Sequence, residues 1–397
     1  MTTTSGGYRY SSKEGRWRFA DAETKNQPAA RLSRPLRLAT LNVLHDRGQH
    51  ELLQHGVRHD AICRELQALD ADVIGLNEVT VSFLERLLRE EWVRGHFTAS
   101  VVPDDARCRH LSTVGGGMGN LLLSRIPPAS VAYVDQEFDG RHSHVMSLCL
   151  GIPQGGAGSS SGDQPVRVAV GSAHLTAFPW LNEGLRRRQL RRVCSALTEA
   201  STADVCLVFG DFNFHREAEN ASIPEGWAEL PAVRALGGTF DFSRNSLLPH
   251  YLPTRNIYNG LGTGLGWPSP MRLDRVLVSH APFREAAAAS TTASTTASTA
   301  ASSAASAKAR LFANEPIHER ARGRPPLPMM GRELEQAHRA LPWEEYLFPS
   351  DHFGLFVELP IAGASQREQH AVPIMPVHGN IEEAHEDEDK APHCSTH

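Results

Sequence analysis

The stretch VFGDFNFH, residues 208–215, decides how this chain is expected to fold. An apolar run through Phe209 stops at Gly210, and Asp211 and Asn213 follow two residues apart. Because residues i and i+2 of an extended chain face the same side, these two side chains project together from a strand end. The stretch therefore predicts a buried strand that delivers a carboxylate and an amide to one site.

A second stretch, SDHFGLFVEL at residues 350–359, has the same organisation in reverse order. Asp351 and His352 stand just before an apolar run that is typical of another buried strand. An Asp-His pair beside an Asp-x-Asn pair can place a general base, an orienting amide and a metal-compatible carboxylate around one phosphate. The two stretches together predict a phosphate site.

Four further stretches place polar residues where strand-like apolar runs begin or end. RLATLNVLHD carries Asn42, DVIGLNEVT carries Glu78, VRVAVGSAHLTAF carries His174 and RLDRVLVS carries Asp274. Polar residues at strand ends, scattered over the chain, are the pattern expected of a site on one edge of a sheet sandwich.

The ordered set of motifs LN, NEV, HL, GDFN, LDRV and SDH resembles that of the endonuclease/exonuclease/phosphatase superfamily, which has the deoxyribonuclease I-like fold. The resemblance runs from about Leu36 to about Leu359. It implies an α/β fold, a four-layer sandwich of two packed mixed β-sheets flanked by helices.

We expect one catalytic domain over residues 35–362. Residues 1–34 form a polar segment that we expect to be partly ordered, with aromatic residues spaced for a single edge strand. Residues 286–309 are nearly all Ala, Ser and Thr, a composition that predicts disorder. Because the strands on either side both supply the site, we expect this segment to be an insertion into the domain. Residues 363–397 predict a disordered acidic tail.

Helices are expected between the strands. HDAICRELQALDAD, residues 59–72, repeats apolar residues with a period of about 3.6, and VSFLERLLREEW, residues 81–92, continues similarly. LNEGLRRRQLRRVCSALTEA, residues 181–200, predicts a helix with an apolar face and five arginines. The arginines form either a phosphate-binding surface or a solvated helix face.

The composition is that of an ordinary soluble enzyme, with 397 residues, 41% hydrophobic and 21% charged. A formal net charge of −5 gives no global basic field, so nucleic-acid binding has to be local. The six cysteines show no C-x-x-C spacing and predict buried reduced thiols. The chain shows no apolar leader or membrane-spanning run, so we expect an intracellular protein in the nucleus or cytoplasm. We also expect a monomer.

Glu78 is the first metal ligand that we predict, because it is a carboxylate at a strand end beside the amide of Asn77. Mg²⁺ keeps several waters and takes one or two carboxylates plus substrate phosphate, so a site with few protein ligands suits it, with Mn²⁺ as an alternative. No Cys/His cluster has zinc spacing, which disfavours zinc. Asn42 and Asp351 complete the expected metal site.

The superfamily resemblance also implies roles for the other residues. Asp211 would orient or deprotonate the attacking water, while Asn42 and Asn213 would hold the phosphate. His352 would contact a phosphoryl oxygen or transfer a proton, with its tautomer set by Asp351 or Asp274.

Two assignments complete the site. His174 falls where many superfamily members carry a second catalytic histidine, and it is a candidate acid for the leaving group. Asn120, in GGGMGNLLLSRIPP, matches a run common in the superfamily and is either a phosphate contact or part of an ordinary turn. Other histidines, namely His45, His50, His55 and His59, are interpreted as surface residues of a polar loop and helix.

Within the superfamily, SDHFGL and the HL…RRRQL run look most similar to the second class of tyrosyl-DNA phosphodiesterases. This likeness implies a Mg²⁺-dependent phosphodiesterase that acts on DNA ends in DNA repair, or on another nucleic acid. Sphingomyelinase-like, deadenylase-like and inositol-phosphatase-like activities of the same fold are the alternatives. A pseudoenzyme that serves as an interaction scaffold is the non-enzyme alternative, but the complete set of polar site residues favours catalysis.

Overall fold

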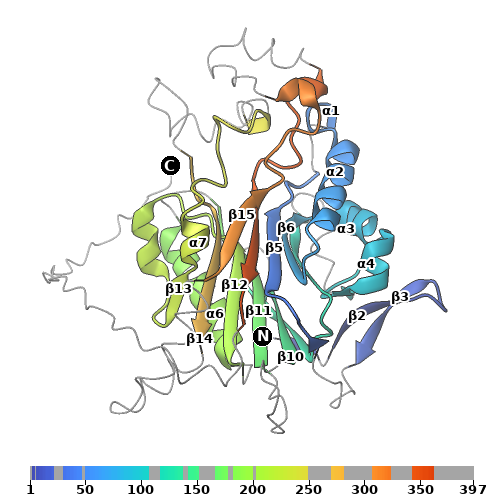
Figure 1. The fold of residues 1–397 in the computed structure, drawn as a ribbon, viewed down its shortest axis with the longest axis vertical. Coiled ribbons are helices and arrows are strands. Elements are labelled where there is room, and N and C mark those ends of the chain that lie inside the picture. Colours follow the sequence, from blue (N-terminus) through green and yellow to red (C-terminus); the bar gives the residue numbers. More distant parts are fainter. Residues whose placement is uncertain are drawn as a thin grey trace, which may run out of the picture.

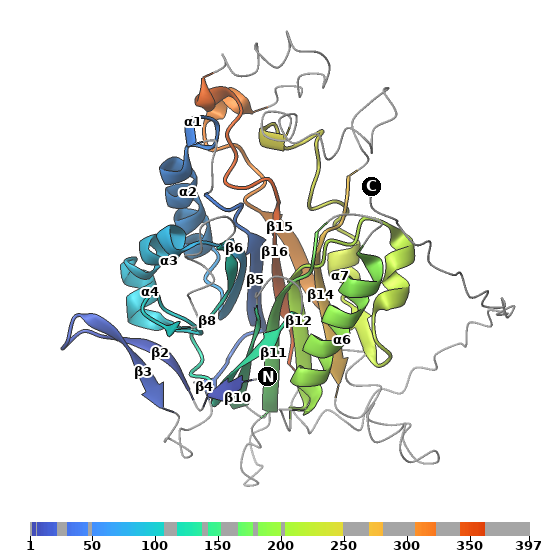
Figure 2. The ribbon, with the colours of Figure 1, turned by 180° about the vertical axis from the view of Figure 1, so that it is seen from behind.

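Two β-sheets packed face to face form the centre of the molecule, and helices lie on both outer sides (Figures 1 and 2). The computed structural model describes residues 2–4, 6–21, 30–46, 50–106, 117–136, 142–151, 166–177, 182–199, 203–248, 270–280, 306–322 and 342–361. Each sheet has eight strands within these ranges. The four-layer α/β sandwich that the sequence predicts is confirmed.

The first sheet has the strand order β1-β9-β10-β11-β12-β14-β13, with β4 paired to β10. Its strands are β1 (Thr2–Thr4), β4 (Ala30–Arg31), β9 (Ser130–Asp135), β10 (His142–Gly151), β11 (Val166–His174), β12 (Val205–Asp211), β13 (Trp227–Glu229) and β14 (Asp274–His280). Strands β11 and β12 run parallel, and β14 runs antiparallel to β12. The last residues of β11 and β12 therefore lie at the same edge as the first residue of β14.

The second sheet has the order β15-β16-β5-β6-β8-β7-β2-β3. Its strands are β2 (Gly6–Ser11), β3 (Arg16–Asp21), β5 (Leu36–Asn42), β6 (Val73–Val79), β7 (Thr98–Ala99), β8 (Gly119–Ser124), β15 (Lys308–Phe312) and β16 (Gly354–Leu359). Strands β5 and β6 run parallel, and β16 runs antiparallel to β5. The ends of β5 and β6 thus share an edge with the start of β16.

The helices flank the sheets as the periodicity predicts (Figure 2). They are α1 (His50–Leu53), α2 (His55–Ala68), α3 (Val81–Leu88), α4 (Glu91–His96), α6 (Glu183–Glu199) and α7 (Pro231–Arg234), with 3₁₀ helices η2 (Glu217–Ser222), η4 (Glu319–Ala321) and η5 (Trp343–Glu345). Helices α2, α3 and α4 cover the sheet that contains β5, and α6 covers the sheet that contains β11. The predicted helix over residues 81–92 is divided into α3 and α4.

Three apolar layers hold the sandwich together. Leu38 and Val73 of one sheet pack with Val170 and Phe209 of the other in the buried cluster between the sheets. Each outer face packs against its helices in a separate cluster. Removing this apolar surface from water is the main favourable term in the fold, and it fixes the two sheets relative to each other.

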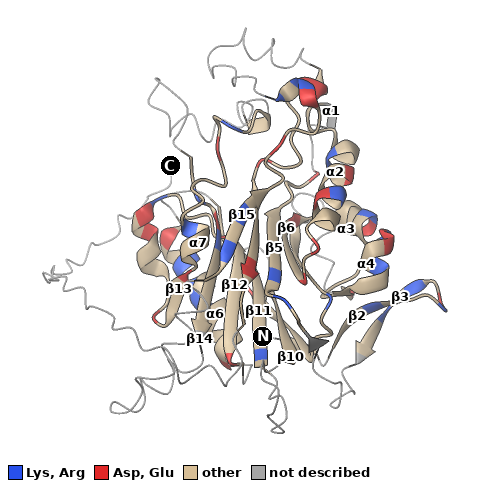
Figure 3. Cartoon of the chain, viewed as in Figure 1, with Lys and Arg blue, Asp and Glu red and all other residues tan. Residues whose placement is uncertain are grey.

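Charge and cysteine placement agree with the composition. Figure 3 shows Lys and Arg interspersed with Asp and Glu along α2, α3 and α4. Cys63, Cys194 and Cys206 are buried free thiols, as expected, and Cys149 is half-buried. Among the described residues, no helix is both long and apolar enough to cross a membrane.

Two boundary predictions need correction. Residues 6–21 form an antiparallel hairpin of β2 and β3, not one edge strand, because the chain turns before Gly15, which has a φ of 67°. The predicted insertion over residues 286–309 extends too far, because β15 begins at Lys308. The insertion up to residue 305 and the predicted tail over residues 363–397 lie outside the described residues.

The interpretation of His59 as a surface residue is wrong. His59 lies on the buried face of α2 with 7% exposure, and its ring centroid is 4.8 Å from that of Phe83. Burial lowers the pKa of His59 from 6.5 to about 4, and the charge of Arg58 adds to the effect. Folding therefore favours the neutral imidazole at this position.

We expect the acid sensitivity of the fold to depend partly on His59. The unfolded chain binds a proton at His59 below pH 6.5, whereas the folded chain does so only near pH 4. This contribution to stability is present above pH 6.5 and is lost as the pH falls toward 4. His59→Phe should lose less free energy of unfolding than the wild type between about pH 7 and about pH 5 in urea titrations. Equal losses in both proteins would refute this role.

Candidate active site

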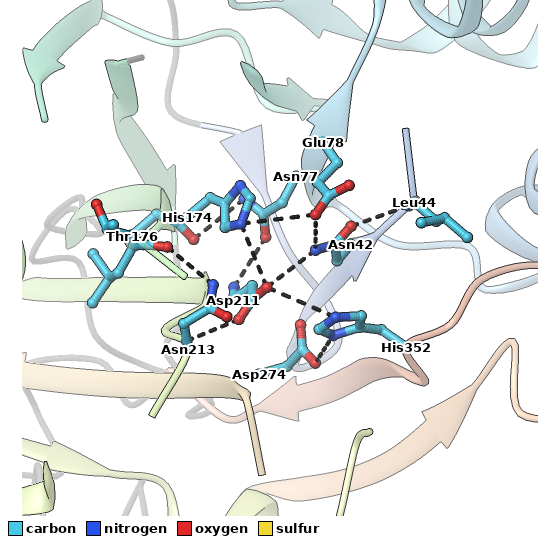
Figure 4. A network of polar contacts seen from close by, with 12 residues as sticks. Asn42, Leu44, Asn77, Glu78, His174, Thr176, Asp211, Asn213, Asp274 and His352 are labelled. Atoms are coloured by element: carbon cyan, nitrogen blue, oxygen red, sulfur yellow. Dashed lines mark hydrogen bonds and ion pairs between the residues drawn. The ribbon is translucent and has the colours of Figure 1, made fainter. Parts of the chain in front are cut away.

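The predicted polar residues come together at one edge of the sandwich (Figure 4). Asn42 ends β5, Glu78 is the penultimate residue of β6, His174 ends β11, Asp211 ends β12, Asp274 begins β14, and His352 precedes β16. Each sheet contributes parallel strand ends and one antiparallel strand start. The site therefore lies across both sheets.

Asp211 is the centre of this arrangement. Its Oδ2 lies 3.0 Å from Asn42 Nδ2 and 3.6 Å from His174 Nε2, and His352 Nε2 is 3.8 Å away. Its Oδ1 accepts the backbone N–H of Asn213 at 2.9 Å. Burial raises the pKa of Asp211 to about 7, against the lowering effect of His352. A carboxylate with a pKa near neutrality can take up a proton at ordinary pH.

His352 is held as a cation by two carboxylates. Its Nδ1 lies 2.8 Å from Asp274 Oδ2, and the residue is 4% exposed. Burial alone would lower the pKa of His352, but Asp274 and then Asp211 raise it to about 10. Of the two carboxylates that the sequence left as alternatives, Asp274 is the one that orients the ring.

Asp351 has different surroundings. Its Oδ1 lies 3.3 Å from the Oγ of Ser350, and the residue is 7% exposed. Burial raises the pKa of Asp351, and the negative charge of Glu78 adds to this effect. Its predicted role as a metal ligand stays a prediction.

Glu78 is ionised and held in a strained conformation. Its φ of 58° lies in the left-handed region, which non-glycine residues seldom adopt and which is found more often at functional sites. Oε1 accepts from Asn42 Nδ2, and Oε2 accepts from the His45 backbone N–H, both at 3.1 Å. Burial raises the pKa of Glu78, but His45 and His174 outweigh it and lower the value to about 2.

His45 is a site residue that the sequence reasoning missed. Its Nε2 lies 3.9 Å from Glu78 Oε2, and its side chain is only 11% exposed. The interpretation of His45 as a surface residue is therefore wrong. The available signal was its position, three residues after Asn42 in the stretch RLATLNVLHD.

Asn77 joins the two sheets behind the site. Its Oδ1 accepts the Asp211 N–H at 3.0 Å, and its Nδ2 donates to Asn120 Oδ1 at 2.7 Å. Asn120 in turn donates to the carbonyl of His142 at 2.7 Å. Asn120 thus supports the backbone of Asp211 through Asn77, and direct contact of Asn120 with phosphate stays a prediction.

Gly210 makes this close approach of the sheets feasible. Its φ is 133°, and a Cβ at this position would lie 2.1 Å from the Ala173 carbonyl oxygen. The same Cβ would lie 2.9 Å from Asn77 Oδ1. Glycine is therefore required directly before Asp211.

Asn213 turns the chain away from β12. Its φ of 51° lies in the left-handed region, which asparagine tolerates better than most residues. Its Nδ2 donates to the Leu175 carbonyl at 3.0 Å, and the residue is 5% exposed. This turn brings the amide beside the ends of β11 and β12.

The arginines of α6 do not share one surface. Arg186 is fully buried, and its Nη2 and Nε lie 2.6 and 2.8 Å from Glu219 Oε2. The expectation that it belongs to an exposed basic face is wrong. The alternatives of phosphate binding and solvation now concern the exposed members, Arg187, Arg188, Arg191 and Arg192.

The donor set fits a hard divalent cation better than a soft one. Within the described ranges, no three His, Cys, Asp or Glu side chains are grouped closely enough to hold a metal by themselves. An ionised Glu78 suits Mg²⁺, which needs one or two carboxylates and completes its shell with water and phosphate. Asn42 donates its N–H groups to Glu78 and Asp211, and its Oδ1 accepts from Leu44 N–H. Binding of the metal by Asn42 therefore stays a prediction.

A family model described as the Endonuclease/Exonuclease/phosphatase family matches residues 39–352. No curated protein matches the sequence. A D. rerio TDP2 structure, complexed with single strand DNA product, is 14% identical, with 82% of this chain and 99% of that chain covered and a TM-score of 0.48. Caenorhabditis elegans TDP2 is 15% identical, with 82% and 97% covered and a TM-score of 0.48. A Bacteroides thetaiotaomicron mannosyl-6-phosphatase is 14% identical, with 82% and 100% covered and a TM-score of 0.45.

Proposed function

Because the chain belongs to the Endonuclease/Exonuclease/phosphatase family, we propose that it is a Mg²⁺-dependent phosphodiesterase that hydrolyses phosphoesters at DNA ends. The observation that supports this most is the position of Asp211 Oδ2 between His174 Nε2 and His352 Nε2, at 3.6 and 3.8 Å. Hydrolysis of an anionic phosphodiester requires charge neutralisation, an activated water and a stabilised leaving oxygen. Separate residues of the site meet these three requirements.

Asp211 activates the water. Its carboxylate is fixed by Asn42 and by the N–H of Asn213, so that Oδ2 is directed into the site. As water attacks phosphorus, its proton passes to Asp211. A pKa of about 7 makes the carboxylate a stronger base than an ordinary aspartate, while a large fraction remains ionised near neutrality.

His352 stabilises the charge that develops on the phosphoryl oxygens. Its raised pKa keeps the imidazole protonated, and Asp274 fixes the ring through Nδ1. The Nε2–H is then directed toward the region beside Asp211. A fixed cation in a site shielded from water stabilises such charge more strongly than it would in solution.

The remaining requirement is a stabilised leaving oxygen. His174 Nε2 lies beside both carboxylates, 3.6 Å from Asp211 Oδ2 and 4.0 Å from Glu78 Oε1. From this position His174 gives a proton to the leaving oxygen of the substrate. Glu78, with Asp351 as the further carboxylate, would hold the cation. Bound there, Mg²⁺ would neutralise phosphate charge and polarise the phosphoryl oxygen.

Motifs and charge support a nucleic-acid end as the substrate. The SDHFGL and HL…RRRQL runs are those that resemble the tyrosyl-DNA phosphodiesterases. With a net charge of −5 and both signs interspersed over the helices, attraction of a nucleic acid would be local to the site (Figure 3). Recognition of an end requires few phosphate contacts, in agreement with this charge distribution.

A substrate screen with a metal control tests the proposal. The purified protein is incubated with single-stranded DNA that carries a 5′-phosphotyrosine, with RNA, with sphingomyelin and with inositol phosphates, in Mg²⁺ and in EDTA. We expect Mg²⁺-dependent release of tyrosine that leaves a 5′-phosphate on the DNA. Turnover of a lipid or inositol phosphate alone would overturn the nucleic-acid assignment. Inactivity on every substrate would favour a scaffold.

A further inference from the structure

Arg58 is a fully buried arginine on the inner side of α2. Its Nε donates to the Leu53 carbonyl at 3.0 Å. Its Nη1 donates to the carbonyls of Val43 at 3.0 Å and Pro349 at 2.8 Å, and its Nη2 donates to the Leu44 carbonyl at 2.8 Å. One guanidinium thus binds backbone oxygens from three separate segments of the chain.

Two of these segments carry the proposed catalytic residues. Val43 and Leu44 directly follow Asn42, and Pro349 directly precedes the run from Ser350 to His352. Figure 4 shows Asn42 and Leu44 on one strand of chain beside His352 on another. Ser350 Oγ also donates to the Asn42 carbonyl at 2.5 Å, so the two segments meet directly as well.

The turn at Leu44 depends on these contacts. Its φ of 54° is in the left-handed region, which is unfavourable for leucine. Its N–H is accepted by Asn42 Oδ1 at 3.0 Å, and its carbonyl is held by Arg58. The turn directs the next backbone N–H, that of His45, to Glu78 Oε2. Strained residues that several contacts hold in place occur mainly at functional sites.

We propose that Arg58 is a positioning residue that holds the segment beside Glu78 and the segment that carries His352 in one fixed arrangement. It acts through backbone carbonyls, not by contact with the substrate. The inference rests on the proposed function, because the two segments are those that carry the proposed catalytic residues. Its chemistry requires arginine, since the planar fork presents five N–H groups in fixed directions, whereas lysine presents one nitrogen.

The test compares Arg58→Lys and Arg58→Met with Leu66→Ala. Leu66 lies on the same helix, is 1% exposed and packs in the outer cluster, so its truncation lowers stability without removing a hydrogen bond from either segment. We expect both Arg58 variants to lower kcat for bis(4-nitrophenyl) phosphate in Mg²⁺, by about 10²-fold for Met and by less for Lys, with KM changed little. At temperatures well below its melting temperature, Leu66→Ala should have the kcat of the wild type.

Hydrogen exchange gives a readout that does not depend on activity. The N–H groups of Leu44, His45 and His352 are bonded to Asn42 Oδ1, Glu78 Oε2 and Ser350 Oγ, respectively. In the Arg58 variants these three amides should exchange faster together, whereas in Leu66→Ala they should exchange at the wild-type rate.

The outcomes separate this inference from the proposed function. Wild-type kcat in Arg58→Lys and Arg58→Met, or exchange that is unchanged in both segments, would overturn the positioning role while leaving the phosphodiesterase intact. A wild-type protein that is inactive on all substrates would refute the proposed function, and the exchange result would then decide alone whether Arg58 joins the segments.

Discussion

Replacement of Asp211 by asparagine is expected to lower kcat by at least about 10²-fold, the usual scale for a lost proton acceptor. Asparagine keeps the shape of the side chain and its bond to the Asn213 N–H, but it takes no proton from water. KM should change far less, because the carboxylate acts in the transition state. The change in stability should be small, because the loss of the Asn42 hydrogen bond to Oδ2 opposes the removal of a buried carboxylate that stands opposite Asp274 across β12 and β14.

His352→Ala should lower kcat on the same scale but differ in stability. Removal of the imidazolium leaves Asp274 buried without the cation that holds it, and Asp274 Oδ1 already has no hydrogen-bond partner among the described residues. Breaking a buried pair by removal of one member typically costs about 3–5 kcal/mol. Urea titrations should therefore show Asp211→Asn near wild type and His352→Ala clearly destabilised.

The double variant decides whether the two groups act as a unit. If Asp211 and His352 serve one phosphoryl group, the double variant should be scarcely slower than the slower single variant. Asp72→Asn is the matched control, since Asp72 is a buried carboxylate at the opposite end of β6 and is bonded to Arg34. Single variants with near wild-type kcat and raised KM would show that these residues only bind phosphate.

The strand ends of this site were readable in the sequence for a physical reason. Strands buried on both faces appear as apolar runs, so a polar residue at the end of such a run marks the sheet edge. Asn42, His174 and Asp211 end their strands where the sequence predicts. The sequence did not predict which carboxylate pairs with His352, because Asp351 and Asp274 are both aspartates beside a strand. The choice follows from the register that places Asp274 opposite Asp211.

Two buried arginines show a signal that the sequence did contain. Arg186 precedes Leu190 by four residues on α6, and Arg58 precedes Ile62 by four residues on α2. Each therefore falls on the apolar stripe of its helix, and both are fully buried. Arg186 was predicted to lie with the other arginines of its helix, whereas the helical period places both Arg186 and Arg58 inward. The Pro349 oxygen that holds Arg58 comes from a segment 291 residues away in sequence, so no local pattern identifies this contact.

Glu78→Gln is expected to abolish Mg²⁺-supported turnover, with a loss of about 10³-fold or more, because a bound cation supplies several kcal/mol of charge stabilisation. Glutamine keeps the length of the side chain and can adopt the same backbone conformation, but it lacks the charge that attracts the cation. Glu358→Gln is the matched control, since Glu358 lies in β16 away from the site and pairs with Arg37. Its turnover should equal that of the wild type.

Stability measurements on the Glu78 variant give a second, independent readout. Mg²⁺ that binds only the folded protein raises the melting temperature in proportion to the logarithm of its concentration. This rise should occur in the wild type and in Glu358→Gln, and it should be absent in Glu78→Gln. Without Mg²⁺, the depressed pKa of Glu78 means that its charge stabilises the fold above pH 4.5 and that this stability is lost as the pH falls toward 2. Glu78→Gln should therefore be less stable than wild type near neutrality and equal to it in strong acid. A variant that retains both the Mg²⁺-induced rise and its turnover would assign the cation to other ligands, with Asp351 as the first to test.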